Sequence, residues 1–247
     1  MSRRIGLQKV KLRLFDALER AIRRNSNLGP GMFFESQRFP WVAQVEAGAP
    51  LIRNELDAVL KFRDSIPSFN DISVEQLKIT DDARWKTFFL YIYGHKLRHN
   101  CELCPETERI LRLIPGMSTA FFSILLPQKK IPLHRGPYCG VLRYHLGLLI
   151  PSPPDACGIS VGGEEAHWQE GKSLIFDDTF MHSAWNFSDD LRVILFVDFA
   201  RPLPFPLSIV NALYIRGVSL TPFVRGVARK QLTWDKILQE AYQRADM

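Results

Sequence analysis

Two histidines far apart in the sequence, His134 and His182, have neighbours suited to a metal site. Each lies beside a stretch with strand-like patterning, and Arg192 follows the second histidine by ten residues. Neutral imidazole binds divalent iron well, and a guanidinium is shaped to hold a carboxylate. The pattern therefore predicts an enzyme whose metal site has an anion clamp beside it.

The third ligand of such a site raises a separate question. Iron sites with two histidines usually add a carboxylate, in many families two residues after the first histidine, and here that position is Gly136. The glycine either excludes the site or marks a particular family. Arg192 could instead pair with Asp189 or Asp190, and the Asp177-Asp178 pair could form a tight turn.

The segment that carries these residues alternates as β-strands do. Over 141–150 the apolar side chains occupy one face, so Arg143 and His145 point together to the other. We expect further strands over 120–126, 131–134, 157–161, 173–176 and 192–199, with a hairpin at Gly162-Gly163. Many short strands predict a mainly β fold, either a barrel or a double-sheet jelly roll.

Helical patterns flank this β-rich segment. The spacing predicts helices over 7–24, 42–62, 105–113 and 234–245, and a loop over 64–82. At 247 residues and 46% hydrophobic content, the chain fits one domain, 1–247. Within it we expect an N-terminal helical region (1–115), a β core (116–205) and a C-terminal wrapping tail with a helix (206–247).

The net charge of +6 is concentrated at the N-terminus, where residues 1–27 hold eight basic and two acidic side chains. The rest is balanced, which argues against a nucleic-acid partner. The basic helix either packs on the body or makes peripheral contact with an anionic membrane, and the basic, apolar C-terminal tail could join it there. No apolar run is long enough to span a membrane and no secretory signal is evident, so we expect a cytoplasmic location.

The four cysteines are expected to be reduced thiols. No disulfide framework is indicated in a chain of this length without a secretory signal. Cys101 and Cys104 form a single C-x-x-C motif, and no second pair follows at zinc spacing. A structural zinc site is therefore the less favoured interpretation.

Several motifs, in order, resemble the aspartyl/asparaginyl β-hydroxylase family, from about Trp85 to Pro206. They are His134-Arg135-Gly136-Pro137, Arg143-Tyr144-His145-Leu146-Gly147-Leu148, Trp168-Gln169-Glu170-Gly171-Lys172-Ser173, Phe176-Asp177-Asp178-Thr179-Phe180-Met181-His182, Trp185-Asn186 and Arg192-Val193-Ile194-Leu195-Phe196-Val197-Asp198. The resemblance implies a double-stranded β-helix, cupin-like in form. It also implies an Fe(II)- and 2-oxoglutarate-dependent oxygenase that consumes O2 and hydroxylates an unactivated C–H bond.

The resemblance also implies roles for individual residues at the iron. His134 and His182 look like the two iron ligands, since the family characteristically has glycine, here Gly136, where the carboxylate would be and water in its place. Asp178 is similar to the acidic residue that the family places near that water.

Other residues would contact the co-substrate or the substrate. Arg192 resembles the clamp on the far carboxylate of 2-oxoglutarate, and Ser123 would hydrogen-bond the same group. Arg143 and His145 resemble an inward pair that meets the co-substrate or the substrate. Trp41, just before a predicted helix, is either a packing residue or part of the pocket mouth.

The substrate is less clearly indicated. The leading expectation is the β-carbon of an aspartyl or asparaginyl residue, or a related amino-acid group. The animal polypeptide hydroxylases carry a basic residue where this chain has Val141, however, and the bacterial lipid A hydroxylases resemble it in Arg143-Tyr144-His145 and Arg201-Pro202. One alternative is therefore hydroxylation of a lipid acyl chain at the membrane surface. Another is a non-catalytic barrel that binds 2-oxoglutarate.

Overall fold

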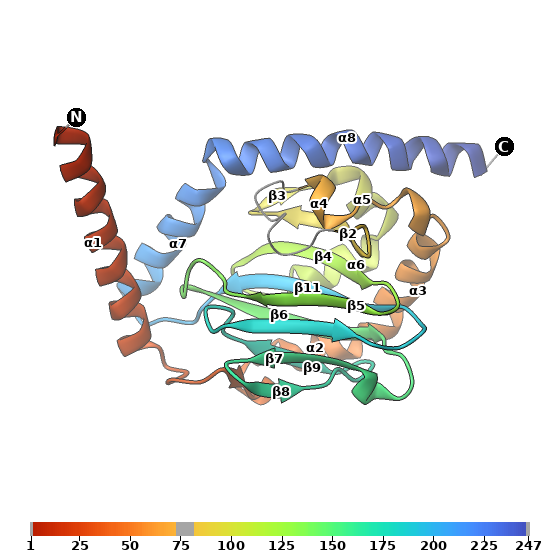
Figure 1. Cartoon of the computed structure of the whole chain (residues 1–247), viewed down its shortest axis with the longest axis horizontal. Helices are drawn as coiled ribbons and strands as arrows, with labels where there is room; N and C mark the ends of the chain where they lie inside the picture. Colours follow the sequence, from red (N-terminus) through yellow and green to blue (C-terminus); the bar gives the residue numbers. More distant parts are fainter. Residues whose placement is uncertain (1, 73–81, 246–247) are drawn as a thin grey trace.

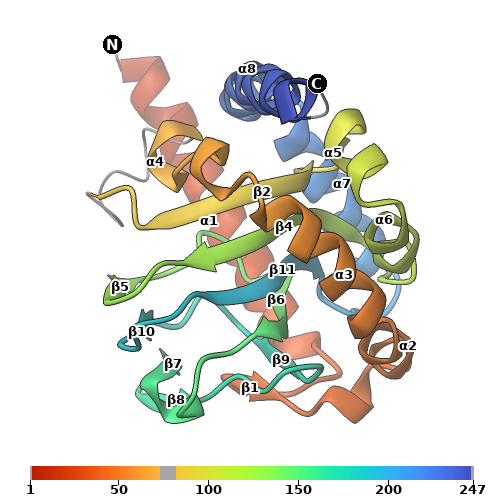
Figure 2. The same ribbon diagram turned by 90° about the vertical axis from the view of Figure 1, so that its right-hand side faces the viewer.

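Two antiparallel β-sheets form the centre of the computed structural model, which describes residues 2–72 and 82–245. The large sheet has the strand order β1-β9-β6-β11-β4-β2-β3 and the small sheet β5-β10-β7-β8 (Figures 1 and 2). The strands are β1 (Phe33–Phe34), β2 (Trp85–Ile92), β3 (His95–Lys96), β4 (Met117–Leu125), β5 (Lys129–His134), β6 (Val141–Leu149), β7 (Cys157–Val161), β8 (Glu164–Ala166), β9 (Ser173–Phe176), β10 (His182–Asn186) and β11 (Arg192–Ala200). The expected cupin-like double-stranded β-helix with flanking helices is confirmed.

The large sheet buries both of its faces, and its strands therefore alternate between two cores. On β11, Leu195 and Val197 belong to a cluster beneath the helices, whereas Ile194 and Phe196 belong to a cluster between the sheets. On β6 the same alternation sends His145 toward the inner layer. The predicted alternation over 141–150 is confirmed, and it places polar side chains between the sheets.

Helices cover the outer face of the large sheet, and helices also form both ends of the described chain (Figure 2). They are α1 (Ser2–Asn25), α2 (Val42–Ala47), α3 (Ala49–Leu60), α4 (Phe69–Ile72), α5 (Arg98–Leu103), α6 (Pro105–Leu111), α7 (Leu207–Ser219) and α8 (Pro222–Ala245). The helix expected over 42–62 divides at Gly48, where a Cβ would lie 2.5 Å from the Ile110 side chain of α6. The C-terminal helix begins at Pro222, well before the expected Trp234.

The sheet also recruits strands from the region expected to be helical. β2 pairs with β4 along most of its length, and Phe33 and Phe34 of β1 pair with β9. The strand region therefore starts before residue 116. The loop expected over 64–82 contains α4, and its residues 73–81 lie outside the described part of the chain.

The N-terminal helix α1 leans against the body beside α7 (Figure 1). Phe15, Leu18 and Ile22 of α1 pack with Tyr138 and with Tyr214 of α7. These three side chains of α1 therefore face the protein, while Leu14 and the basic side chains of Arg13, Arg20 and Arg24 are exposed. No single described helix is long and apolar enough to cross a membrane, although α7 and Val224–Gln231 meet that length and composition together as a pair bent by 52°.

Candidate active site

The imidazoles of His134 and His182 face each other at one end of the small sheet. His134 is the last residue of β5, His182 is the first of β10, and the two are partners in the antiparallel register. Their ring centroids are 4.1 Å apart. The β5–β10 pairing thus brings together two side chains that are 48 positions apart in the sequence.

Each imidazole is held by the backbone carbonyl two residues before it. His134 Nδ1 lies 2.8 Å from the Pro132 oxygen, and His182 Nδ1 lies 2.9 Å from the Phe180 oxygen. Because a carbonyl can only accept, each Nδ1 carries the hydrogen and each Nε2 keeps its lone pair. The Nε2 atom of His182 is buried and has no hydrogen-bond partner. This pair therefore fits a divalent metal ion, which would occupy the space the lone pairs face.

Burial keeps both imidazoles neutral, as metal ligands must be. It lowers the pKa of His134, and it lowers the pKa of His182 to about 3 with a further contribution from the nearby Arg143 guanidinium. At neutral pH both side chains therefore present lone pairs without first losing a proton.

The position of the missing carboxylate is filled by another acidic side chain. A Cβ on Gly136 would lie 2.1 Å from Oδ2 of Asp178, so residue 136 has no room for a side chain. Burial raises the pKa of Asp178 to about 6, although Arg143, whose Nη2 lies 2.8 Å from Asp178 Oδ2, opposes this shift. No group of three or more His, Cys, Asp or Glu within residues 2–72 and 82–245 is placed to hold a metal. A metal ion held by His134 and His182 would therefore have two protein ligands.

Arg192, the predicted anion clamp, is a deeply buried cation. Its side chain is 1% exposed and forms no ion pair with any described residue, Asp189 and Asp190 included. Its Nη1 donates to the Ser123 carbonyl at 3.3 Å, while its Nε has no partner. Burial lowers the pKa of Arg192 to about 9, which leaves it charged at neutral pH. An unpaired buried guanidinium is costly, and an anionic ligand would remove that cost.

His145 supplies a second unpaired donor in the same layer. The indole N–H of Trp168 donates to His145 Nδ1 at 3.3 Å, which places the imidazole hydrogen on Nε2. That Nε2 is buried without a partner, and burial lowers the pKa of His145 well below its usual value. Trp85 Nε1 donates to Ser123 Oγ at 3.0 Å and leaves the hydroxyl hydrogen available. The donors fit a carboxylate, the group by which 2-oxoglutarate would be held.

A cavity of about 370 Å³ adjoins His134. His134, Arg143 and Asp178 line one part of it, and most of the remaining lining is apolar. The apolar lining includes Phe69, Phe89, Ile92, Phe121, Val141, Phe196, Ile215, Val218 and Val227. Arg192, Ser123 and His145 do not line it, so the site has two parts, a cationic pocket between the sheets and an apolar cavity beside His134.

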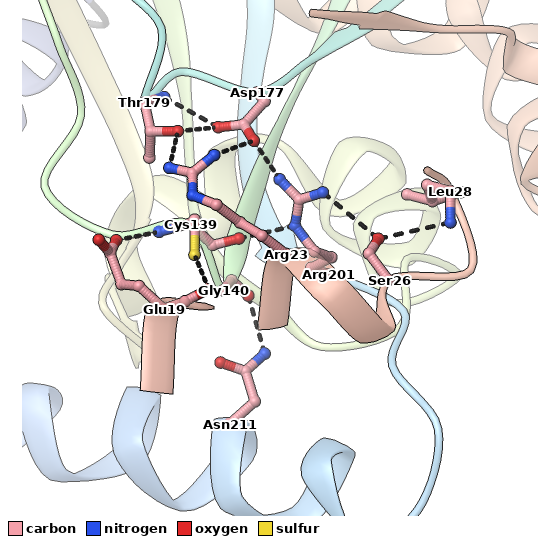
Figure 3. Close-up of polar contacts among 10 residues, drawn as sticks. All are labelled: Glu19, Arg23, Ser26, Leu28, Cys139, Gly140, Asp177, Thr179, Arg201 and Asn211. Atoms are coloured by element: carbon pink, nitrogen blue, oxygen red, sulfur yellow. Dashed lines mark hydrogen bonds and ion pairs between the residues drawn. The ribbon is translucent and has the colours of Figure 1, made fainter. Parts of the chain in front are cut away.

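A buried ionic network supports the two segments that adjoin His134 and His182 (Figure 3). Asp177 forms an ion pair with Arg201, and both side chains are 3% exposed. Arg23 of α1 donates to Thr179 Oγ1 at 2.9 Å, and Arg201 Nε donates to the Cys139 carbonyl at 2.6 Å. The segment after His134 and the segment before His182 are thereby fastened to each other and to α1.

The structure places one predicted site residue elsewhere. Trp41 packs edge-on against Tyr144 and Phe199, with centroids 5.1 and 5.3 Å away, in the core beneath the helices. It does not line the cavity beside His134 but a separate hollow with Phe39 and Phe199, so its expected part in substrate binding is corrected to a packing role. The remaining predicted residues do gather in the two parts of the site.

Two contributions to the site were not anticipated. Asp198 accepts a hydrogen bond from Arg143 Nε at 3.1 Å, and the Arg192 guanidinium lies 4.6 Å from the centre of the Trp168 ring. Trp168 belongs to a quoted motif, which was the available signal. Asp198 is the last residue of another such motif, but nothing in that motif indicated its pairing with Arg143.

Comparisons with known proteins give a consistent result. A family model described as aspartyl/asparaginyl beta-hydroxylase matches residues 46–202. An ornithine lipid ester-linked acyl 2-hydroxylase of Rhizobium tropici is 46% identical over 211 residues, which covers 85% of this chain and 75% of that protein. Human aspartate beta-hydroxylase domain-containing protein 2 is 35% identical over 62% of this chain and 44% of its own length. The chain thus spans less than half of that human relative.

Solved structures of cupin domains are similar to part of this chain at low identity. The cupin domain of Schizosaccharomyces pombe Cnp3 matches 48% of this chain and 66% of its own, with a TM-score of 0.33 and 8% identity. A cupin domain of an Enterobacter cloacae transcriptional regulator matches with a TM-score of 0.34 and 12% identity, over 48% of this chain and 99% of its own.

Proposed function

Since this chain belongs to the aspartyl/asparaginyl β-hydroxylase family, we propose that it is an Fe(II)- and 2-oxoglutarate-dependent hydroxylase of a lipid acyl chain. The observation that carries the substrate class is the apolar cavity beside His134. The similarity to the Rhizobium tropici enzyme named for an ornithine lipid supports the same choice.

One set of site residues would bind the metal ion and another set would bind the co-substrate. His134 and His182 would hold the iron through Nε2, and Arg192, His145 and Ser123 would hold a carboxylate of 2-oxoglutarate. When bound, iron, 2-oxoglutarate and O2 together supply the oxidising power that hydroxylates an unactivated C–H bond. The protein positions the reacting carbon and keeps bulk water from the site.

Arg143 argues against the aspartyl substrate that the sequence favoured first. Recognition of a substrate carboxylate needs a cation that is free to form an ion pair. The Arg143 guanidinium is instead engaged by Asp178 at 2.8 Å and by Asp198 at 3.1 Å, and it lies over the Phe196 ring. The Arg143 guanidinium is therefore compensated and does not favour a carboxylate beside His134, while Arg135, the other arginine of the lining, is exposed.

The apolar part of the cavity provides the corresponding binding energy. Each methylene that leaves water is worth about 0.8 kcal/mol, so a chain of several carbons would bind there without any ionic contact. Ile215 and Val218 of α7 and Val227 of α8 extend the apolar wall away from His134. A fatty chain can then reach the metal with its remainder held by these helices.

The test is a competition between two substrate classes. The protein, loaded with Fe(II), 2-oxoglutarate and O2, is given ornithine lipid together with an aspartyl-containing peptide. We expect succinate in equal amount to a lipid whose acyl chain has gained one oxygen atom, and an unchanged peptide. Oxidation of the peptide alone would contradict the lipid assignment, and 2-oxoglutarate that binds but is never consumed would favour the non-catalytic barrel.

A further inference from the structure

Helix α7 exposes an apolar face that the rest of the described chain does not cover. The exposed large side chains are Ile209 (51%), Val210 (45%), Leu213 (64%) and Leu220 (57%), the last just beyond the helix end. Phe205, in the segment before the helix, is 79% exposed. Positions 209, 213, 216 and 220 recur at helical spacing, so these side chains form one continuous face. Arg216 is the charged residue of α7 on this face.

The opposite face of α7 is part of the enzyme's substrate cavity. Tyr214, Ile215 and Val218 line that cavity, together with His134 at its metal end. Asn211, which is 1% exposed, donates to the Gly140 carbonyl at 2.8 Å and accepts from the Tyr138 hydroxyl at 2.7 Å. One helix therefore separates the cavity from the surroundings and is anchored to the segment that follows His134 (Figure 3).

The charge of this region is all of one sign. From Arg201 to Trp234 the sequence contains five basic residues and no Asp or Glu. Beside α7 stands α1, whose Arg13, Arg20 and Arg24 are exposed. A helix face with bulky apolar side chains, flanked by cations, has the composition of a surface that lies in the interface of an anionic bilayer.

We propose that the outer face of α7, from Phe205 to Leu220, docks on an anionic phospholipid bilayer and that acyl chains pass over this helix into the cavity. This inference deepens the proposed function and depends on it for the identity of the chain that enters. The main apolar contact belongs to α7 and the preceding segment, because Phe15, Leu18 and Ile22 of α1 pack against Tyr138 and Tyr214, which leaves Leu14 as the exposed large apolar side chain of α1 within residues 13–25. From its flanking position α1 contributes cations.

The docking surface is tested by replacing one of its apolar side chains with a charged one, alongside a matched control variant. Leu213→Asp places a carboxylate on the outer face of α7, where little packing is lost. Leu51→Asp makes the same change at a side chain of α3 that is 43% exposed, and α3 lies on the opposite side of the molecule from α7 (Figure 1). Each full-length protein is floated with vesicles of phosphatidylcholine containing about 30 mol% phosphatidylglycerol.

We expect L213D to reduce the fraction bound to vesicles by at least about tenfold, because one large apolar side chain would no longer be buried in the bilayer. L51D should bind as the unaltered protein does. Arg216→Gln should weaken binding about fivefold at low salt and less at high salt, because its charge acts through the surface potential. Equal binding by L213D and the unaltered protein would overturn the proposal.

Turnover separates failure of docking from failure of the proposed function. With ornithine lipid in the vesicles, L213D should be at least about tenfold slower than L51D, whereas with the same lipid in neutral detergent micelles the two should be equal. Equal loss in both media would mean a damaged cavity and would overturn the docking role. Turnover by neither protein in either medium, with flotation still lost in L213D, would refute the proposed function and leave docking supported.

A second copy of the chain is the competing occupant of this face. Light scattering after gel filtration distinguishes it, since a dimer through α7 would dissociate in L213D. A dimer that persists on vesicles and buries Leu213 would contradict bilayer contact. We expect the unaltered protein and L213D to have the same monomeric mass in solution.

Discussion

The guanidinium of Arg192 lies 4.6 Å from the centre of the Trp168 ring, and both side chains are 1% exposed. Trp168 also fixes the tautomer of His145, so a single indole positions both unpaired donors of the anion pocket. This cationic pocket carries no carboxylate of its own among the described residues, and it is therefore incomplete without an anion.

Arg192→Met should abolish the response to 2-oxoglutarate without destabilising the ligand-free fold. The substitution removes an uncompensated buried charge but keeps an extended apolar stem, so the melting temperature of the ligand-free protein should stay level or rise. The KM for 2-oxoglutarate should rise at least about a hundredfold, the loss of a charge-assisted pair. A thermal shift with 2-oxoglutarate equal to that of the unaltered protein would contradict the clamp.

Gly136→Ala should destabilise the protein through Asp178. The added Cβ would meet the Asp178 carboxylate at 2.1 Å, and overpacking of this kind costs about 1–3 kcal/mol in the free energy of unfolding. In an Asp178→Ala background the same change should cost less than about 0.5 kcal/mol, because the obstacle is gone. Urea denaturation of the four proteins of this cycle measures the difference, and equal costs in both backgrounds would show that the glycine is required for another reason.

His145 should make the metal-free protein less stable in acid. Burial lowers the pKa of His145 in the folded state, while in the unfolded chain it titrates near 6.5, so below that pH only the unfolded chain takes up the proton. The free energy of unfolding should therefore fall with pH below about 6.5, by up to about 1.4 kcal/mol per pH unit from this group. With a chelator present, His145→Phe should reduce the slope of the unfolding free energy against pH by the contribution of one proton. An unchanged slope would mean that His145 is protonated in the folded protein.

Val227→Trp should shorten the preferred acyl chain. Val227 lines the apolar wall of the cavity on α8, and a larger ring there would occupy space that the end of the chain needs. Competition among ornithine lipids of different chain lengths, followed by mass spectrometry, should show a preference shorter by about two or more carbons, at about 0.8 kcal/mol for each excluded methylene. Thr233→Trp, an exposed position on the same helix, is the control. The same shift in both variants would show that Val227 does not determine which chain length the cavity prefers.

Local patterning predicted those parts of the fold that depend on one strand or helix. The two-residue period over 141–150 correctly gave β6 and the shared direction of Arg143 and His145. The strand β10 was not anticipated, because His182–Asn186 is short and acquires its partners β5 and β7 only in the folded sheet. The start of α8 was also missed, because the prediction began this helix only at Trp234, although Pro222 suits a first helical position.

The sequence predicted which residues gather in the site, but it did not predict how their charges are paired. The resemblance brought His134, His182 and Arg192 forward as a set, and the structure gathers them. It could not reveal that Arg143 is neutralised by Asp178 and Asp198, because those pairs depend on the register of β11 against β6 and on the loop before β10. That neutralisation turns the substrate inference from an aspartyl side chain toward an acyl chain.

The central claim is that His134 and His182 share one metal ion beside the Arg192 pocket, and a crystal structure of the protein with Mn(II) and 2-oxoglutarate under anaerobic conditions tests it most directly. We predict manganese bonded to Nε2 of both histidines, with a carboxylate of 2-oxoglutarate on the Arg192 guanidinium. Manganese bound elsewhere, or bound by only one of the two imidazoles, would contradict the account.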